Sequence, residues 1–231
     1  MSLEDRKLSQ MGFDLVRLMK SMLSSFLWIL LLSSCAIDQP QAVQKHVIYL
    51  HGRIVELQGP DAVHPNYGAY EYQEIIDSLS ASGGLVHYEV RDADTDFYEF
   101  ANRTSALIDS LIAAGVEPSA ITVVGASKGA VMAMQIAHQN AAPIRYVLLG
   151  ANNEALETQQ DWNLHGYILG IYETSDQLAG RPYDHWINRS TNAMSFEQLP
   201  VTTGLGHGFL YRPYVEWLAP TRAWMGQESG N

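Results

Sequence analysis

Six short runs of apolar residues recur along the chain from residue 46 onward, and each predicts a β-strand. The predicted strands lie at residues 46–50 (HVIYL), 85–90 (LVHYEV), 121–124 (ITVV), 144–150 (IRYVLLG), 166–172 (GYILGIY) and 194–200 (MSFEQLP). The runs are rich in β-branched or aromatic residues, and most are continuously apolar instead of alternating with polar positions. Such runs are typical of strands in a sheet that is covered on both faces.

Helical patterns fill several of the segments between these runs. In residues 70–84 and 97–115, apolar side chains recur at the three- and four-residue spacing of a helix, and the two patterns stop at Gly83 and Gly115. A strand–helix–strand order requires right-handed crossovers, which generate a parallel sheet with helices on both faces. The expected fold class is therefore α/β, a three-layer α/β/α sandwich around a mainly parallel sheet of about six strands.

Length and composition limit the classes of function. The chain has 231 residues, of which 47% are hydrophobic, and this fits one domain with an ordinary core. The net charge is −11, and 14 basic residues against 25 acidic ones do not supply the clustered Lys and Arg that nucleic-acid phosphates require. The single cysteine excludes an internal disulfide, and no CxxC, HExxH or Cys/His cluster suggests zinc. We expect no nucleic-acid partner, no metal and no cofactor.

The N-terminal residues have the composition of a secretion signal. Residues 21–34 are mostly apolar and follow Arg17 and Lys20. The apolar run is shorter than the roughly 20 residues that cross a bilayer, whereas it fits the apolar region of a signal peptide. A buried core helix is the less favoured alternative. Because signal peptides usually begin shortly before their basic residues, Met19 is an alternative start of the chain.

Residues 32–35 (LSSC) resemble the bacterial lipobox, in which the cysteine is acylated and becomes the first residue of the mature protein. This resemblance implies a signal peptide at residues 1–34, a lipid anchor at Cys35 and a tether at residues 35–45. Ala36 after the cysteine implies transfer to an outer membrane, so the expected location is the bacterial cell envelope, on the periplasmic side. The alternative is a signal peptide cut elsewhere, with Cys35 incidental.

The stretch VVGASKGAV, residues 123–131, joins a predicted strand to a predicted helix. Gly125 and Gly129 flank Ser127, and the helical pattern begins at Lys128. The two glycines permit a strained turn and leave room for the serine hydroxyl to project. The helix N-terminus adds unpaired N–H groups and a partial positive charge next to that hydroxyl. Although Gly-x-Ser-x-Gly is a short motif, this context is the one that a serine nucleophile requires.

With this turn, residues 46–225 resemble the α/β-hydrolase superfamily. The resemblance implies a nucleophile at Ser127, followed along the chain by an acid after a later strand and a histidine after the last strand. Asp176 follows the fifth predicted strand, and His207 lies between glycines after the sixth. His207 would accept the serine proton, and a carboxylate on its other ring nitrogen would fix the tautomer. The expected catalytic residues are therefore Ser127, Asp176 and His207.

Three other acids could take the role given to Asp176. Asp184 lies in a later loop, Glu173 lies close to the fifth predicted strand, and Asp161 precedes that strand. Asp184 is the main competitor. His185 is the rival to His207, but no predicted strand precedes its loop. Loop position favours Asp176 and His207.

A His-Gly pair follows the first predicted strand at residues 51–52. In related hydrolases such a pair lets a following backbone N–H point into an oxyanion hole, so the resemblance assigns that role to the N–H groups of Arg53 and Lys128. Ile54 is the alternative to Arg53. The Lys128 side chain is expected to face solvent. Residues 151–165 are too few for the lid of larger members, and this implies an open, shallow site.

These observations favour a serine hydrolase, carboxylesterase-like, in which residues 46–231 form the hydrolase domain. It would cleave a carboxylic ester or related acyl bond of a small-molecule substrate through an acyl-enzyme, and a lipid anchor would hold it at the membrane. A second interpretation is a non-catalytic envelope lipoprotein that uses the same fold for binding. A third is another acyl chemistry, that of a thioesterase, amidase or acyltransferase.

Overall fold

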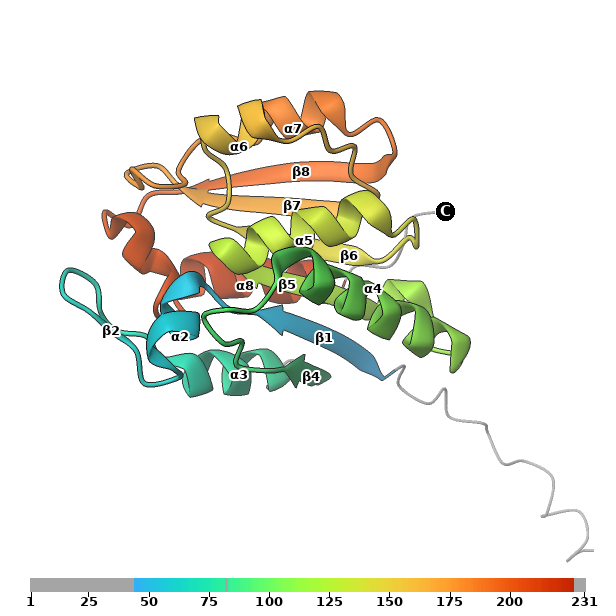
Figure 1. The fold of residues 1–231 in the computed structure, drawn as a ribbon, viewed down its shortest axis with the longest axis horizontal. Helices are drawn as coiled ribbons and strands as arrows, with labels where there is room; N and C mark the ends of the chain where they lie inside the picture. The colour runs from blue at the N-terminus through green and yellow to red at the C-terminus, as the bar shows by residue number, and fades with distance from the viewer. Residues whose placement is uncertain (1–43, 82, 227–231) are drawn as a thin grey trace, which may run out of the picture. The chain divides into compact units, whose positions relative to one another are not determined.

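The computed structural model describes residues 44–81 and 83–226, and its main sheet has six parallel strands (Figure 1). The strands are β1 (Lys45–Leu50), β4 (Gly84–Tyr88), β5 (Ile121–Ala126), β6 (Arg145–Leu149), β7 (Gly166–Glu173) and β8 (Ala193–Val201). They are hydrogen-bonded in the order β4-β1-β5-β6-β7-β8, and each neighbouring pair is parallel. The predicted parallel sheet is confirmed, and each of the predicted strands is present within one or two residues of its expected ends.

Helices cover both faces of this sheet. Helices α3 (Tyr72–Ser80) and α8 (Val215–Gly226) pack on one face. Helices α4 (Phe97–Ala113), α5 (Lys128–Gln139) and α7 (Asp184–Arg189) pack on the other. The fold is therefore the expected three-layer α/β/α sandwich.

Several short elements lie in the connections, where the sequence pattern predicts only loops. They are α2 (Arg53–Gln58), α6 (Glu154–Gln159), a two-stranded hairpin of β2 (Val63–His64) and β3 (Gly68–Ala69), and the 3₁₀ helices η1 (Pro118–Ala120) and η2 (Gly206–Leu210). Elements of six residues or fewer contain less than two helical turns, so they carry no readable apolar period.

The alternation of β1 explains why its sequence is continuously apolar. Val47 and Tyr49 point into the core beneath α3 and α8, whereas Ile48 and Leu50 point into the core beneath α4 and α5. Both sets are buried. A strand covered on only one face would show polar residues at every second position.

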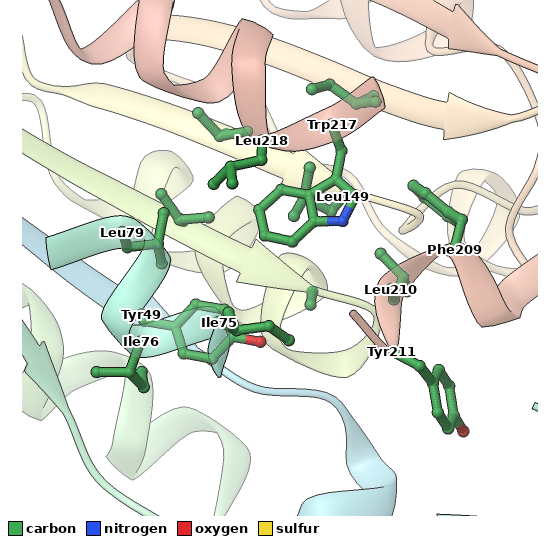
Figure 2. Close-up of a cluster of buried hydrophobic side chains, with 14 of the residues drawn as sticks. Tyr49, Ile75, Ile76, Leu79, Leu149, Phe209, Leu210, Tyr211, Trp217 and Leu218 are labelled. Carbon is green, nitrogen blue, oxygen red and sulfur yellow. The ribbon is translucent and has the colours of Figure 1, made fainter. Parts of the chain in front are cut away.

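The core beneath α3 and α8 also holds the segment that carries His207. Figure 2 shows Ile75, Ile76 and Leu79 of α3 around Tyr49, with Trp217 and Leu218 of α8 above Leu149. Phe209 and Leu210 of η2 are buried in the same cluster. Burial of each side chain of this size stabilises the fold by roughly 1.5–3 kcal/mol. Since these two residues follow His207 almost directly, the core anchors the histidine segment.

Helix α5 approaches the sheet closely because of two glycines. A Cβ on Gly129 would overlap the carbonyl oxygen of Leu50 in β1, and a Cβ on Gly125 would overlap the carbonyl of Gly129. Between these glycines, Ser127 has φ 53° and ψ −119°. It is the one non-glycine residue of the described segments with a positive φ, and such a conformation costs on the order of 1–3 kcal/mol.

The N-terminal predictions concern residues that the structure does not describe. The signal peptide of residues 1–34 and the lipid anchor at Cys35 lie outside the described residues. Within residues 44–81 and 83–226, no helix combines the length and the apolar character needed to span a bilayer.

We predict that Gly129→Ala lowers the free energy of unfolding by about 3 kcal/mol, because the added methyl group would force α5 away from β1. Urea denaturation measures this change. Gly226→Ala is the matched control, since the nearest atom to its added methyl group would be the Lys45 Nζ at 3.7 Å, and its effect should be within about 0.5 kcal/mol. Equal stability of the two variants would contradict the close-packing explanation.

Candidate active site

Ser127 lies at the carboxyl end of β5, in the turn that begins α5. Its backbone N–H donates a hydrogen bond to the Leu149 carbonyl at the end of β6, with an N···O distance of 2.9 Å. Its own carbonyl accepts from Ala130 and Val131 in the first turn of α5. The backbone of the turn is therefore held on both sides, and its strained dihedral angles are fixed by the surrounding structure.

The three side chains expected to form the catalytic set lie in one hydrogen-bonded chain. The Ser127 Oγ is 2.8 Å from His207 Nε2, and His207 Nδ1 is 2.6 Å from Asp176 Oδ2. A carboxylate accepts only, so the Nδ1–H donates to Asp176 and Nε2 is left to accept from the serine hydroxyl. The residues come from the β5–α5 turn, the loop after β7 and η2, and the fold brings them to one edge of the sheet.

Asp176 is held as an ionised acceptor. Its side chain is buried, and its second oxygen accepts from the N–H groups of Leu178 at 2.8 Å and Ala179 at 3.3 Å. Burial alone would raise the pKa of this carboxyl, but the hydrogen bond and charge of His207, together with the two N–H groups, outweigh it and hold the pKa below its ordinary value. The carboxylate therefore stays charged beside the imidazole.

Glu173, weighed as a rival acid, has a different place in the structure. It ends β7, is fully buried, and its Oε1 accepts from the N–H groups of Thr203 at 3.0 Å and Gly204 at 3.2 Å. Its Oε2 accepts from the N–H and hydroxyl of Ser175. Burial alone would raise the pKa of Glu173, but the hydrogen bonds outweigh burial and hold the pKa below its ordinary value. Glu173 thus connects the loop of Asp176 to the loop of His207.

The other three residues weighed for the catalytic set contact groups that do not belong to the serine–histidine–aspartate chain. Asp184 begins α7, and its carboxylate accepts from the side-chain amide of Gln198 on β8 at 2.7 Å. Asp161 precedes β7, at the other end of that strand from Asp176, and pairs with Arg189. His185 lies in α7, with its ring 4.9 Å from that of Trp186. The structure brings none of these three into the hydrogen-bonded chain.

The loop after β1 lies directly against the serine turn. Because Leu50 of β1 is in register with Gly125 of β5, the loops that follow the two strands are neighbours, and a Cβ on Gly52 would lie 3.4 Å from that of Ser127. Arg53 and Lys128 are the first residues of α2 and α5, where backbone N–H groups have no acceptor within their helix. Within the described residues, neither N–H donates to a protein acceptor.

A buried carboxylate that the sequence analysis missed joins these two loops. Glu56 of α2 accepts from Lys128 Nζ at 2.6 Å and from Arg91 Nε at 2.9 Å. The prediction that Lys128 faces solvent is therefore wrong, since its side chain is only 28% exposed and is paired with an acid. No local signal marks this cluster, because its members come from separate segments that meet only once the sheet has formed.

His51 is buried in the same cluster as a neutral ring. The N–H of Arg91 donates to its Nε2 at 2.9 Å, so the ring proton is on Nδ1 and donates to the Gly52 carbonyl at 2.9 Å. Burial, and then the positive charge of Arg91, lower the pKa of His51 from 6.5 to about 4. The His-Gly pair of the sequence thus fixes the loop after β1 through the imidazole.

A pocket of about 380 Å³ opens beside Ser127 and His207. Besides these two, its lining residues are Gly52, Arg53, Ile54, Leu57, Gln58, His64, Tyr70, Ala126, Leu178, Leu210 and Tyr211. The volume lies near the lower end of the range of small-molecule sites. Within the described residues, no group of three or more His, Cys, Asp and Glu side chains is placed to hold a metal ion.

Comparisons with known proteins identify the fold. The structure resembles the esterase Pf2001 of Pyrococcus furiosus, with a TM-score of 0.55 and 14% sequence identity over 80% of this chain and 85% of the other. It resembles SOBER1 of Arabidopsis thaliana with a TM-score of 0.52 and 15% identity, over 79% of this chain and 97% of the other. It also resembles a protein from Xanthomonas campestris pv. campestris that is assigned to the alpha/beta hydrolase superfamily. The TM-score is 0.50 and the identity 17%, over 79% of this chain and 96% of the other.

No protein-family model matches the chain, and no curated protein matches its sequence. At identities of 14–17%, the structural likeness establishes the fold, which is the α/β-hydrolase fold expected from the sequence.

We predict that His51 makes the stability of the protein fall below neutral pH. The unfolded chain takes up a proton at His51 below about pH 6.5, whereas the folded protein resists protonation until about pH 4. The stability that neutral His51 contributes is therefore fully present above about pH 6.5 and is lost as the pH falls toward about 4. The free energy of unfolding should fall by about 2 kcal/mol between pH 7 and pH 5.

Urea denaturation at pH 7 and pH 5 measures this loss in the wild type and in His51→Gln. Glutamine keeps an acceptor for the Arg91 N–H but does not titrate, so the variant should be less stable at pH 7 and should lose less stability between the two pH values. An identical loss in the variant would assign the pH dependence to other groups.

Proposed function

We propose that this protein is a serine hydrolase that cleaves a carboxylic ester, or a related acyl bond, through an acyl-enzyme intermediate. The hydrogen-bonded chain from Ser127 through His207 to Asp176, at the mouth of a pocket, is the observation that carries the proposal. A serine hydroxyl is a weak nucleophile until a base within hydrogen-bond reach accepts its proton, and a distance of 2.8 Å meets that requirement.

In the first half-reaction, the Ser127 Oγ attacks the acyl carbonyl carbon while its proton moves to His207 Nε2. The negative charge on the carbonyl oxygen of the tetrahedral intermediate would be bound by the backbone N–H groups of Arg53 and Lys128. The intermediate then collapses, the bond to the leaving group breaks, and His207 gives its proton to the departing oxygen. This leaves an acyl ester on Ser127.

In the second half-reaction, water attacks the acyl ester and gives a proton to His207. The tetrahedral intermediate collapses, the free acid leaves, and the proton returns to Ser127. Asp176 stays ionised throughout, because its role is to hold the imidazole in the correct tautomer and to stabilise the imidazolium that forms twice in the cycle.

The known proteins of similar fold support hydrolysis over binding without catalysis, since one of them is an esterase and another is described in terms of the hydrolase superfamily. The buried carboxylates support it as well. A binding protein gains nothing from desolvating Glu173 and Glu56 in order to fix the loops around a serine–histidine contact. Hydrolysis of a thioester or an amide, or transfer of the acyl group to an alcohol, would use the same residues. A panel of ester, thioester and amide substrates separates these reactions from ester hydrolysis.

We propose further that Cys35 carries a lipid anchor that holds the enzyme at the bacterial cell envelope, on the periplasmic side of the outer membrane. The lipobox-like sequence at residues 32–35, which follows an apolar run, supports this location.

The proposed chemistry predicts that Ser127→Ala abolishes labelling by a fluorophosphonate probe, which reacts with activated serines. Asp176→Asn should slow ester hydrolysis by about 10³–10⁴-fold, because asparagine favours the wrong histidine tautomer. Asp184→Asn is the matched control and should keep wild-type activity, since that carboxylate bonds to Gln198. Absence of labelling in the folded wild type would favour the binding-protein interpretation instead.

The proposed anchor predicts that the chain expressed in bacteria incorporates a clickable fatty acid and that Cys35→Ala loses the label and the membrane association. Cys35 is the single cysteine of the sequence, so loss of a thiol-linked lipid is specific to this position. Mass spectrometry of the mature N-terminus supplies the second measurement. A mature protein that begins elsewhere and lacks lipid would refute the anchor.

A further inference from the structure

The pocket beside Ser127 carries no carboxylate, although the chain as a whole has a net charge of −11. Of the residues that line it, none is Asp or Glu, and one, Arg53, is a cation. Acidic side chains outnumber basic ones by 25 to 14 in the sequence, so a lining without acids is a departure from the rest of the molecule. Among the side chains of the lining, the one permanent charge is therefore positive.

The Arg53 side chain is exposed and, within the described residues, has neither an ion pair nor a hydrogen bond. Three other cations of the described residues differ in this respect. Lys128 and Arg91 are both paired with Glu56, and Arg212 is paired with Glu71 at 3.0 Å. Arg53, a residue of the pocket lining, thus keeps all five N–H donors of its guanidinium free of acceptors within the described residues.

Two further side chains of the lining use their acceptor atoms inside the protein and keep their donors. The Gln58 Oε1 accepts from the Val63 N–H at 3.0 Å, which leaves its amide NH₂ group. The His64 Nδ1 accepts from the Asn66 N–H at 3.2 Å, so the ring proton is on Nε2. Three side chains of the pocket lining therefore keep donors that no protein acceptor within the described residues uses, and such donors match a ligand that only accepts.

We propose that Arg53 is a specificity-determining residue that binds an anionic oxygen group, a carboxylate or a phosphate, on the ester substrate. The inference rests on the proposed function and adds the charge of the substrate to it. Arg53 would contribute twice, by its backbone N–H to the oxyanion and by its side chain to a second, permanent negative charge. Ile54, Leu57 and Leu178, which line the same pocket, would contact the apolar part of that substrate.

The chemistry of arginine suits this role. A guanidinium forms two parallel hydrogen bonds with a carboxylate or a phosphate, and it is always charged. An exposed ion pair alone contributes little, but apolar walls beside the pocket reduce the competition from water. The anion would distinguish the substrate from neutral esters that fit the same volume.

The test compares three acetate esters with the same acyl group and similar phenolic leaving groups. They are 4-acetoxybenzoate, 4-acetoxyphenyl phosphate and the neutral 4-acetoxybenzamide. The ratio of kcat/KM for each anionic ester to that for the neutral one is measured in the wild type, Arg53→Gln and Arg53→Lys. Intrinsic differences in reactivity, and any loss common to all esters, cancel when these ratios are compared between variants.

We expect the ratio to fall about 10-fold in Arg53→Gln, as when one charge-assisted hydrogen bond is lost, and to be only partly restored in Arg53→Lys, which keeps the charge but not the two parallel hydrogen bonds. The larger fall identifies carboxylate or phosphate as the preferred anion. Arg212→Gln is the matched control, because it changes the net charge equally but removes an arginine already paired with Glu71, and it should keep the wild-type ratio. Equal ratios in Arg53→Gln and the wild type would overturn the proposal.

A binding measurement separates this proposal from the hydrolase mechanism. In a Ser127→Ala background, calorimetric titration with 4-acetoxybenzoate and 4-acetoxybenzamide should show tighter binding of the anion, and Arg53→Gln should remove the difference. If none of the esters is hydrolysed but this difference is found, the proposed function fails and the anion site stands. If esters are hydrolysed but neither the binding nor the ratio depends on Arg53, the anion site fails and the hydrolase stands.

Discussion

The backbone conformation of Ser127 is the constraint on which the rest of the site depends. A serine with φ 53° and ψ −119° is strained, so the turn persists only where the surrounding contacts outweigh that cost. Those contacts are the hydrogen bond to Leu149 and the packing of α5 on β1 through Gly129. The same close packing sets the hydroxyl at the sheet edge, 2.8 Å from His207 Nε2, so the strain, the packing and the serine–histidine contact share one cause.

Two buried carboxylates hold the neighbouring loops in place around this turn. Glu173 accepts hydrogen bonds from both loops that carry the acid and the histidine, whereas Glu56 joins the loop after β1 to Lys128, next to the serine. Neither would take part in the chemistry. Buried charges are costly unless they are paired or hydrogen-bonded, and removing one partner of a buried ion pair such as that of Glu56 typically destabilises a protein by about 3–5 kcal/mol. Apolar packing positions the elements, and the carboxylates fix the loops between them.

The sequence contains enough information for the main fold but not for these links. Strands such as β1 are readable because both faces are buried, and the patterns of α4 and α5 are long enough to show a helical period. The position of Asp176 in the loop directly after a predicted strand also favours it over Asp184. Helix α2 is too short to be predicted from the sequence, so the position of Glu56 on it could not be predicted either. The contact between Glu56 and Arg91 spans 35 positions and depends on the pairing of β4 with β1, and the contact between Glu56 and Lys128 depends on the pairing of β5 with β1.

The disposition of negative charge around the site has one physical explanation. A reaction that develops an oxyanion next to Ser127 is slowed by any uncompensated carboxylate nearby. Two acids next to the site are used inside the fold: Asp176 accepts from His207 and two N–H groups, and Glu56 is neutralised by two cations. Neither of these carboxylates lines the pocket, whereas Arg53 does. The hydrogen bonds and ion pairs that fix the loops therefore also engage the two carboxylates, so the order of the loops and the lack of acids in the pocket lining have a common origin.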